Sequence, residues 1–179
     1  MDDIVRQAMA KWPQVPDCYG WLGLDARGHW YMRDDRTQAA GPFPLAKGAL
    51  LRHEKLQDFI ARNYEADAQG RWFFQNGPQR VYVELEAAPW VWRLSADGGV
   101  AAHDGRPAQV RQVLMDERGR LFLLTDLGLG LVHTQDMALA AEAGCPTQDG
   151  LDMLLAQGIK QLQLWLAHLP KQTRQAGQT

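Results

Sequence analysis

Asp25-Ala26-Arg27-Gly28 is the first of four segments in which an aspartate is followed, at once or after a short polar gap, by glycine. In such a segment the aspartate accepts hydrogen bonds from the backbone that follows it, and the glycine adopts the positive φ that a tight turn requires. The other three segments are residues 67–70, 97–99 and 116–119. Each is followed by residues typical of a β-strand, so the sequence predicts extended segments joined by tight turns.

The residues around these turns predict β-hairpins. Residues 21–24 and 29–33 flank the first turn, and a strand at 71–75 continues through Asn76-Gly77, a strong hairpin signal, into a strand at 79–85. Further short strands are expected at 90–94, 110–115, 120–125 and 128–133. Most of the chain is therefore expected to form antiparallel sheet.

Three segments have the apolar spacing of helices. Residues 2–12 precede Pro13, residues 52–64 carry apolar side chains three and four positions apart, and leucines line residues 147–169 up to Pro170. We therefore expect an α+β fold, in which a hairpin-linked antiparallel sheet is flanked by helices that include a long C-terminal helix. It would form a single domain over residues 1–170, within which 17–85 and 86–170 could be two related sheet lobes, followed by a polar tail at 171–179.

Composition restricts the class of protein. Apolar residues make up 46% and charged residues 22% of the 179, which are ordinary values for a globular protein. The formal net charge is −2 with no long run of one sign, so we expect no nucleic acid partner. No apolar run is long enough for a signal peptide or a membrane span, which predicts a cytoplasmic protein that does not associate with membranes.

Residues 63–85, from Asn63-Tyr64 through Gly70-Arg71-Trp72 to Glu84-Leu85, together with Tyr31-Met32-Arg33-Asp34-Asp35, resemble a family of uncharacterised proteobacterial proteins of about this length. The resemblance extends over most of the chain. It implies that this is a bacterial protein with a domain of unknown function. It implies no activity and assigns no role to any residue.

The motifs of common enzyme classes are missing from the sequence. Serine occurs only at Ser95, and there is no phosphate-binding or dinucleotide-binding glycine motif. The segment that starts at His53-Glu54 has Gln57 where a zinc protease has its second histidine, so we expect no metal there and no cofactor. The histidines at positions 29, 103, 133 and 168 show no ligand spacing, and most are expected to be surface residues.

The aromatic residues are the sequence feature that indicates a binding function. Five of the seven tryptophans fall on expected strands, where they suit either a packed core or a recognition surface. For a recognition surface, adjacent strands would present aromatic faces and guanidinium groups to a ligand. The candidate ligand-binding residues are Trp30, Tyr31, Arg33, Asp34, Arg80 and Tyr82.

These observations favour a non-enzymatic protein that binds a small molecule or a protein, with a regulatory role open, acting as a monomer or a homodimer. The alternative is an enzyme whose site is assembled from distant residues: Asp34 or Asp35, a histidine and Arg80. A deep polar pocket that joins these groups would favour the enzyme, whereas a shallow aromatic face would favour binding.

Overall fold

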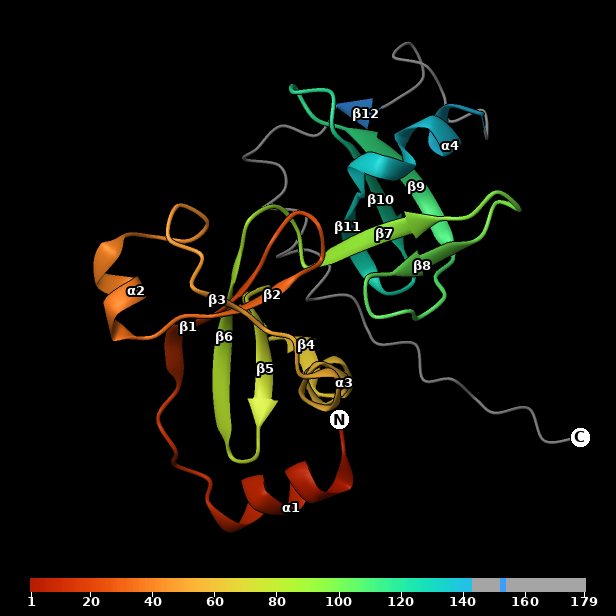
Figure 1. Ribbon diagram of the computed structural model, residues 1–179. Coiled ribbons are helices and arrows are strands. Elements are labelled where there is room, and N and C mark those ends of the chain that lie inside the picture. The colour runs from red at the N-terminus through yellow and green to blue at the C-terminus, as the bar shows by residue number, and fades with distance from the viewer. Residues whose placement is uncertain (143–151, 154–179) are drawn as a thin grey trace, which may run out of the picture.

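The computed structural model describes residues 1–142 and 152–153 of the 179-residue chain. Of the helix expected at 147–169, only residues 152–153 are described, and they form a strand, β12 (Asp152–Met153), so a long C-terminal helix is not shown. The rest of that segment and the tail expected at 171–179 lie outside the described residues. Within them, strands form two six-stranded sheets. Short helices surround the first sheet, and others follow the strand of the second sheet that ends at residue 132 (Figure 1). An α+β architecture is therefore confirmed.

The first sheet has the strand order β3-β2-β1-β6-β5-β4. Its strands are β1 (Cys18–Leu24), β2 (Trp30–Met32), β3 (Ala49–Leu50), β4 (Tyr64–Ala66), β5 (Trp72–Asn76) and β6 (Gln79–Leu85). The second sheet has the order β12-β9-β10-β11-β7-β8. Its strands are β7 (Trp90–Leu94), β8 (Val100–Ala102), β9 (Val110–Met115), β10 (Leu121–Thr125), β11 (Gly128–Val132) and β12 (Asp152–Met153).

The two sheets share one connection pattern. In each, a hairpin (β1–β2 or β7–β8) is followed by a three-strand meander (β4–β5–β6 or β9–β10–β11). The last strand of each meander pairs in parallel with the first strand of its hairpin, β6 with β1 and β11 with β7. The prediction of an antiparallel, hairpin-linked sheet is therefore right only in part, because both sheets also contain parallel pairs. Parallel pairing joins segments distant in sequence and leaves no turn signal between them.

The predicted turns are confirmed by their hydrogen bonds. The backbone N–H of Asp25 donates to the carbonyl of His29, and that of Gly28 donates back to the carbonyl of Asp25, both at 3.0 Å. The same pair of bonds closes the turns that begin at Asp67 and Asp116, and the turn expected at 97–99 begins at Ser95. These turns fix the hairpin geometry on which both sheets depend.

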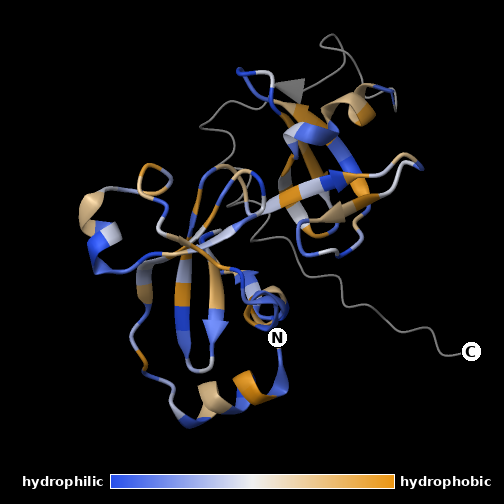
Figure 2. Ribbon diagram, in the orientation of Figure 1, coloured by the Kyte–Doolittle hydropathy of each residue, from blue (hydrophilic) through white to orange (hydrophobic). Residues whose placement is uncertain are grey.

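Aromatic residues form the core where the two sheets meet. Trp30, Tyr64, Trp90 and Trp92 are buried in one apolar cluster that draws residues from both sheets. The indole N–H groups of Trp90 and Trp92 donate to the carbonyls of Leu127 and Leu123, so their burial leaves no donor unsatisfied. Figure 2 shows apolar residues concentrated on the strands and hydrophilic residues in most of the connecting turns.

The helices among the described residues are short. They are α1 (Asp3–Lys11), α2 (Asp35–Ala40), α3 (Glu54–Arg62) and α4 (Met137–Glu142), with the 3₁₀ helix η1 (Thr134–Asp136) before α4. α1 and α3 lie within the segments 2–12 and 52–64 expected to be helical. α3 begins where the imidazole Nδ1 of His53 accepts a hydrogen bond from the N–H of Leu56. None of the helices in the described part of the chain is long and apolar enough to cross a membrane.

Candidate functional site

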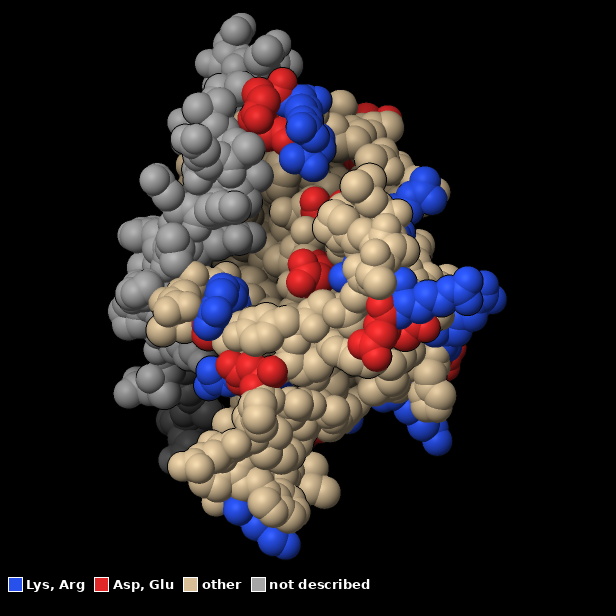
Figure 3. Space-filling model, turned by 90° about the vertical axis from the view of Figure 1, so that its left-hand side faces the viewer, with Lys and Arg blue, Asp and Glu red and all other residues tan. Residues whose placement is uncertain are grey.

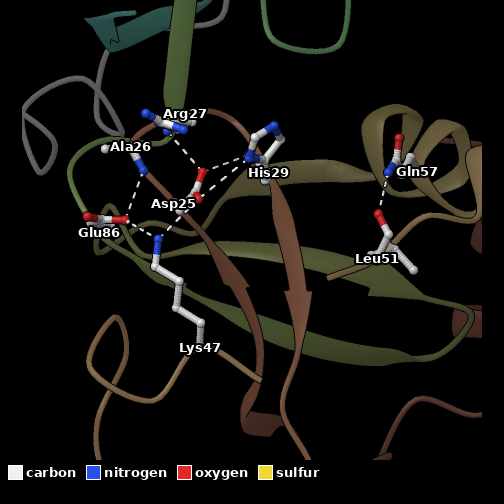
Figure 4. Close-up of polar contacts among 8 residues, drawn as sticks. All are labelled: Asp25, Ala26, Arg27, His29, Lys47, Leu51, Gln57 and Glu86. Carbon is white, nitrogen blue, oxygen red and sulfur yellow. Dashed lines mark hydrogen bonds and ion pairs between the residues drawn. The ribbon is translucent and has the colours of Figure 1, made fainter. Parts of the chain in front are cut away.

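Two carboxylates meet at the ends of parallel strands β1 and β6. Asp25 follows β1 directly and Glu86 follows β6, and the carboxyl ends of parallel strands are a common position for binding groups. Lys47 reaches them from the segment between α2 and β3. Its Nζ lies 3.1 Å from Oδ2 of Asp25 and 3.2 Å from Oε2 of Glu86 (Figure 4). We call Asp25, His29, Lys47 and Glu86 the Asp25 cluster.

Asp25 is almost completely enclosed, with 3% of its surface exposed. Its Oδ1 accepts hydrogen bonds from the backbone N–H groups of Arg27 and His29, both at 2.9 Å. Burial alone would raise the pKa of this carboxyl, but these two bonds and the Lys47 ammonium outweigh it, so the pKa is lowered. Asp25 is therefore held as a buried anion.

The charge of Lys47 is fixed by the same contacts. Partial burial works against the ammonium, but the hydrogen bonds to Asp25 and Glu86 outweigh it and raise the pKa of Lys47 above its usual value. Tyr31 lies beside the pair, with Lys47 Nζ 5.3 Å from the centre of its ring. Burial, and then the negative charge of Asp25, raise the pKa of the Tyr31 hydroxyl.

The Asp25 turn differs from its two counterparts at one position. In the Asp67 and Asp116 turns the fourth residue after the aspartate is an arginine, whose Nε donates to Oδ2 at 2.8 Å (Arg71) and 2.6 Å (Arg120). In the Asp25 turn that residue is His29, whose Nδ1 lies 3.7 Å from Oδ2, too far for a hydrogen bond. Lys47 neutralises Asp25 instead, and the His29 side chain remains 53% exposed.

Arg33 fixes the segment that carries Lys47. Its guanidinium is buried and donates to three backbone carbonyls, those of Ala46 at 3.0 Å, Gly20 at 3.1 Å and Gly41 at 2.6 Å. The bond to Ala46 anchors the residue that precedes Lys47 in the sequence. Arg33 is therefore a positioning residue behind the Asp25 cluster.

The Asp25 turn rests on the second sheet. A Cβ atom added at Gly28 would lie 2.5 Å from Cβ of His103 and 3.5 Å from Cβ of Val91 in β7. Ala26 packs against an apolar cluster that includes Leu129 and Leu131 of β11. The turn thus joins the two sheets, and its position depends on a glycine at residue 28.

His133, at the end of β11, lies near this turn. It is 6% exposed, and its Nδ1 accepts a hydrogen bond from the N–H of Gln135 at 3.2 Å. Burial lowers the pKa of its imidazole, and so do the positive charges of Arg93, Arg27 and His29, against the opposing charge of Asp136. Basic groups from both sheets therefore act on one another at this junction.

The residues predicted from the sequence to bind a ligand are spread over the first sheet. Trp30 is buried against Tyr64 at 5.3 Å between ring centres, and Tyr82 donates to Asp67 while stacking on Tyr19. Arg80 lies over the ring of Phe73, and Asp34 caps α2 through the N–H of Thr37. Of the six, Tyr31 and Arg33 adjoin the Asp25 cluster. A binding role for these residues stays a prediction.

Sequence reasoning did not single out Asp25, Lys47 or Glu86 as site residues, and it treated His29 as a surface histidine. A signal was nevertheless present. Two of the turns have the form Asp-x-x-Gly-Arg, whereas the first is Asp25-Ala-Arg-Gly-His29. The change from arginine to histidine marks the turn whose aspartate needs another cation.

The charges around the site do not form a single-sign field. Figure 3 shows acidic and basic side chains interspersed over one face of the molecule. Within residues 1–142 and 152–153, no group of three or more His, Cys, Asp or Glu side chains is placed to hold a metal ion. In the Asp25 cluster the ammonium of Lys47 occupies the position between the two carboxylates.

Comparison with known proteins yields an uncharacterised family. No curated protein matches the chain. A DUF1285 family protein from Silicibacter pomeroyi is similar in structure, with 10% identity, a TM-score of 0.49, and coverage of 79% of this chain and 84% of that one. A DUF1285 family protein from Shewanella baltica is similar with 16% identity, a TM-score of 0.47, and coverage of 68% and 91%. Residues 1–177 match the family DUF2944, described as "Protein of unknown function (DUF2946)", and the chain belongs to this family.

Proposed function

We propose that the protein is a cytoplasmic, non-enzymatic binding module for a small molecule, and that the Asp25 cluster is its ligand site. The observation that carries this proposal is the replacement of a structural arginine by His29. In two equivalent turns the aspartate is neutralised within the turn itself. In the third turn Lys47 takes over that task, which leaves an imidazole beside a buried carboxylate and open to solvent.

The arrangement provides preorganised polar groups. Glu86 uses Oε2 for its hydrogen bonds to Ala26 and Lys47, and among the described residues none reaches its Oε1. Lys47 uses two of its three N–H donors on the carboxylates. One acceptor, one donor and the His29 imidazole thus remain for a ligand, on a frame held by backbone hydrogen bonds. A few convergent polar groups on a rigid frame are typical of small-molecule sites.

Covalent catalysis is less well supported. The four residues of the Asp25 cluster carry no hydroxyl or thiol, and the pKa of the neighbouring Tyr31 hydroxyl is raised by burial and by the charge of Asp25. Lys47 is kept protonated by its two carboxylates, which removes its lone pair as a nucleophile. A second candidate function is that of an enzyme in which His29 acts as general base. The observation in its favour is an imidazole that is exposed to solvent, with Nδ1 3.7 Å from Oδ2 of Asp25, although it lacks the hydrogen bond that orients a catalytic histidine.

A thermal-shift screen of small acids, amines, sugars and nucleotides tests the proposal, because a ligand that binds only the folded state raises Tm. Each compound that stabilises the wild type is then tested on Asp25→Asn and on Asp116→Asn. Both substitutions alter the same type of turn, but only the first removes a charge from the Asp25 cluster. We expect the ligand-induced shift to disappear in Asp25→Asn and to persist in Asp116→Asn. Equal shifts in both variants would reject this site.

A further inference from the structure

We infer that the junction between the two sheets binds a small anion, a carboxylate or a phosphate group, through Arg27, His29 and His133. This inference rests on the proposed function and specifies its ligand. Arg27 and His29 come from the Asp25 turn of the first sheet, and His133 comes from the end of β11 in the second. No one of these residues was predicted to bind a ligand.

Packing places these residues at one junction. Val91 pairs with Leu131 across the parallel strands β7 and β11, and Gly28 lies over Val91. Residues two apart on a strand point to the same face, so His133 shares the face of Leu131, against whose cluster Ala26 packs. Arg27 lies between Ala26 and Gly28 in the sequence, so its backbone is held beside this face while its side chain is exposed.

Arg27 differs from the other arginines of these turns. Arg71 and Arg120 form ion pairs with the aspartates of their own turns. Arg27 is exposed, and its only hydrogen bond among the described residues is the one from its backbone N–H to Asp25. A guanidinium presents paired N–H donors that match the oxygens of a carboxylate or a phosphate. Its side chain is thus available for such a group.

His133 supplies a donor from the second sheet. Because its Nδ1 accepts the N–H of Gln135, the neutral imidazole carries its proton on Nε2. Nε2 has no hydrogen-bond partner among the described residues. His29 adds a second imidazole, whose side chain is 53% exposed. An anion at this junction would receive donors from both sheets.

Electrostatics favours negative charge at this position. Burial, the largest cause, lowers the pKa of the His133 imidazole, and the positive charges of Arg93 and Arg27 lower it further, against the charge of Asp136. Arg93 is already paired with Asp136 at 2.6 Å. The carboxylates of Asp25 and Glu86 are engaged by Lys47, which approaches Asp25 from the side opposite to Arg27 and His29 (Figure 4). A bound anion would therefore reduce repulsion among the basic groups.

The inference is tested by two-dimensional NMR of the histidine side chains during titration with inorganic phosphate or with acetate at constant ionic strength. We expect saturable shifts of the His29 and His133 signals and a rise in the pKa of the His133 imidazole. Arg27→Gln should weaken the affinity at least about tenfold, the effect of losing a charge-assisted hydrogen bond. Arg118→Gln is the matched control, because Arg118 holds the same turn position in the Asp116 turn and is also exposed.

Each outcome decides one question. A response to phosphate alone identifies a phosphorylated ligand, and a response to acetate alone identifies a carboxylic acid; both support the inference. An affinity unchanged by Arg27→Gln, or reduced equally by Arg118→Gln, overturns it. If a neutral or cationic compound shifts the His29 and His133 signals while neither anion does, the anion site is wrong and the binding function stands. If no compound shifts them, both fail.

Discussion

His29 and Arg120 occupy the same position in two turns of the same geometry, but only Arg120 bonds to its aspartate through its side chain. Nε of Arg120 lies 2.6 Å from Oδ2 of Asp116, whereas Nδ1 of His29 lies 3.7 Å from Oδ2 of Asp25. The fold repeats this turn and so provides its own control. Substitutions in the Asp116 turn measure how much the turn itself contributes to the free energy of unfolding. The same substitutions in the Asp25 turn also measure the contribution of the contacts that this turn makes with the second sheet.

Gly28→Ala is expected to destabilise the protein more than Gly119→Ala. Both glycines have positive φ, +83° and +72°, so each substitution carries backbone strain of about 1 kcal/mol. A Cβ at residue 119 meets nothing within 4 Å, whereas one at residue 28 would overlap His103. We expect an additional loss of about 2 kcal/mol for Gly28→Ala in urea unfolding. Equal losses in the free energy of unfolding for the two variants would show that Gly28 does not pack closely against His103.

Lys47→Met should lower the free energy of unfolding by about 2 kcal/mol, because it leaves the buried carboxylate of Asp25 without its cation. The value is below that of a fully buried pair because the Lys47 side chain is 36% exposed. Lys55→Met, at an exposed position in α3, is the control and should change stability by less than about 0.5 kcal/mol. Asp25→Asn combined with Lys47→Met should recover part of the loss. An additive double variant would contradict the coupling.

Arg33→Lys is expected to destabilise the protein by about 3 kcal/mol, although it conserves the charge. A lysine ammonium cannot reach the three carbonyls that the buried guanidinium of Arg33 bonds in different directions. Arg36→Lys, at an exposed position in α2, should have almost no effect. Urea unfolding of both variants measures the difference. A stable Arg33→Lys variant would mean that the segment carrying Lys47 is held by other contacts.

Acid should destabilise the protein partly through His103. Burial, the largest cause, lowers the pKa of this imidazole from 6.5 to about 4, against the opposing charges of Asp104 and Asp25. In the unfolded chain His103 takes up a proton near pH 6.5, whereas in the fold it stays neutral down to about pH 4. Its contribution is therefore complete above that unfolded pKa and is lost as pH falls toward the folded one.

The measurement is the free energy of unfolding of the wild type and of His103→Gln across this pH range. Glutamine does not titrate, and its amide oxygen can accept the Val91 N–H that Nδ1 of His103 accepts now. From about pH 7 to about pH 4.5 the wild type should lose about 2 kcal/mol more than the variant. Parallel pH profiles would show that folding does not lower the pKa of His103.

The local features of the fold could be predicted from the sequence. Asp-x-x-Gly segments fix turns through bonds within five residues, and Asn76-Gly77 fixes the β5–β6 hairpin in the same way. The parallel pairing of β1 with β6 could not be predicted. It brings Leu24 beside Leu85, and nothing in either segment specifies a partner so distant in sequence.

The candidate site was missed for the same reason. Asp25 was recognised as a turn residue, but its contact with Lys47 and its position beside Glu86 depend on that parallel pair and on the segment fixed by Arg33. Arg33 itself was expected to meet a ligand, because an arginine near aromatic strands suits recognition. In the structure its guanidinium donates to three backbone carbonyls of the protein itself.

The most direct test of the ligand site exchanges His29 and Arg120 between the Asp25 and Asp116 turns. His29→Arg should give the Asp25 turn the ion pair of its counterparts, so stability should stay within about 1 kcal/mol of the wild type. Titrated by calorimetry with a compound that stabilises the wild type, His29→Arg should show no binding, whereas Arg120→His should bind with wild-type affinity. Wild-type affinity in His29→Arg would contradict the account, because the Asp25 turn would then be a structural turn like the others.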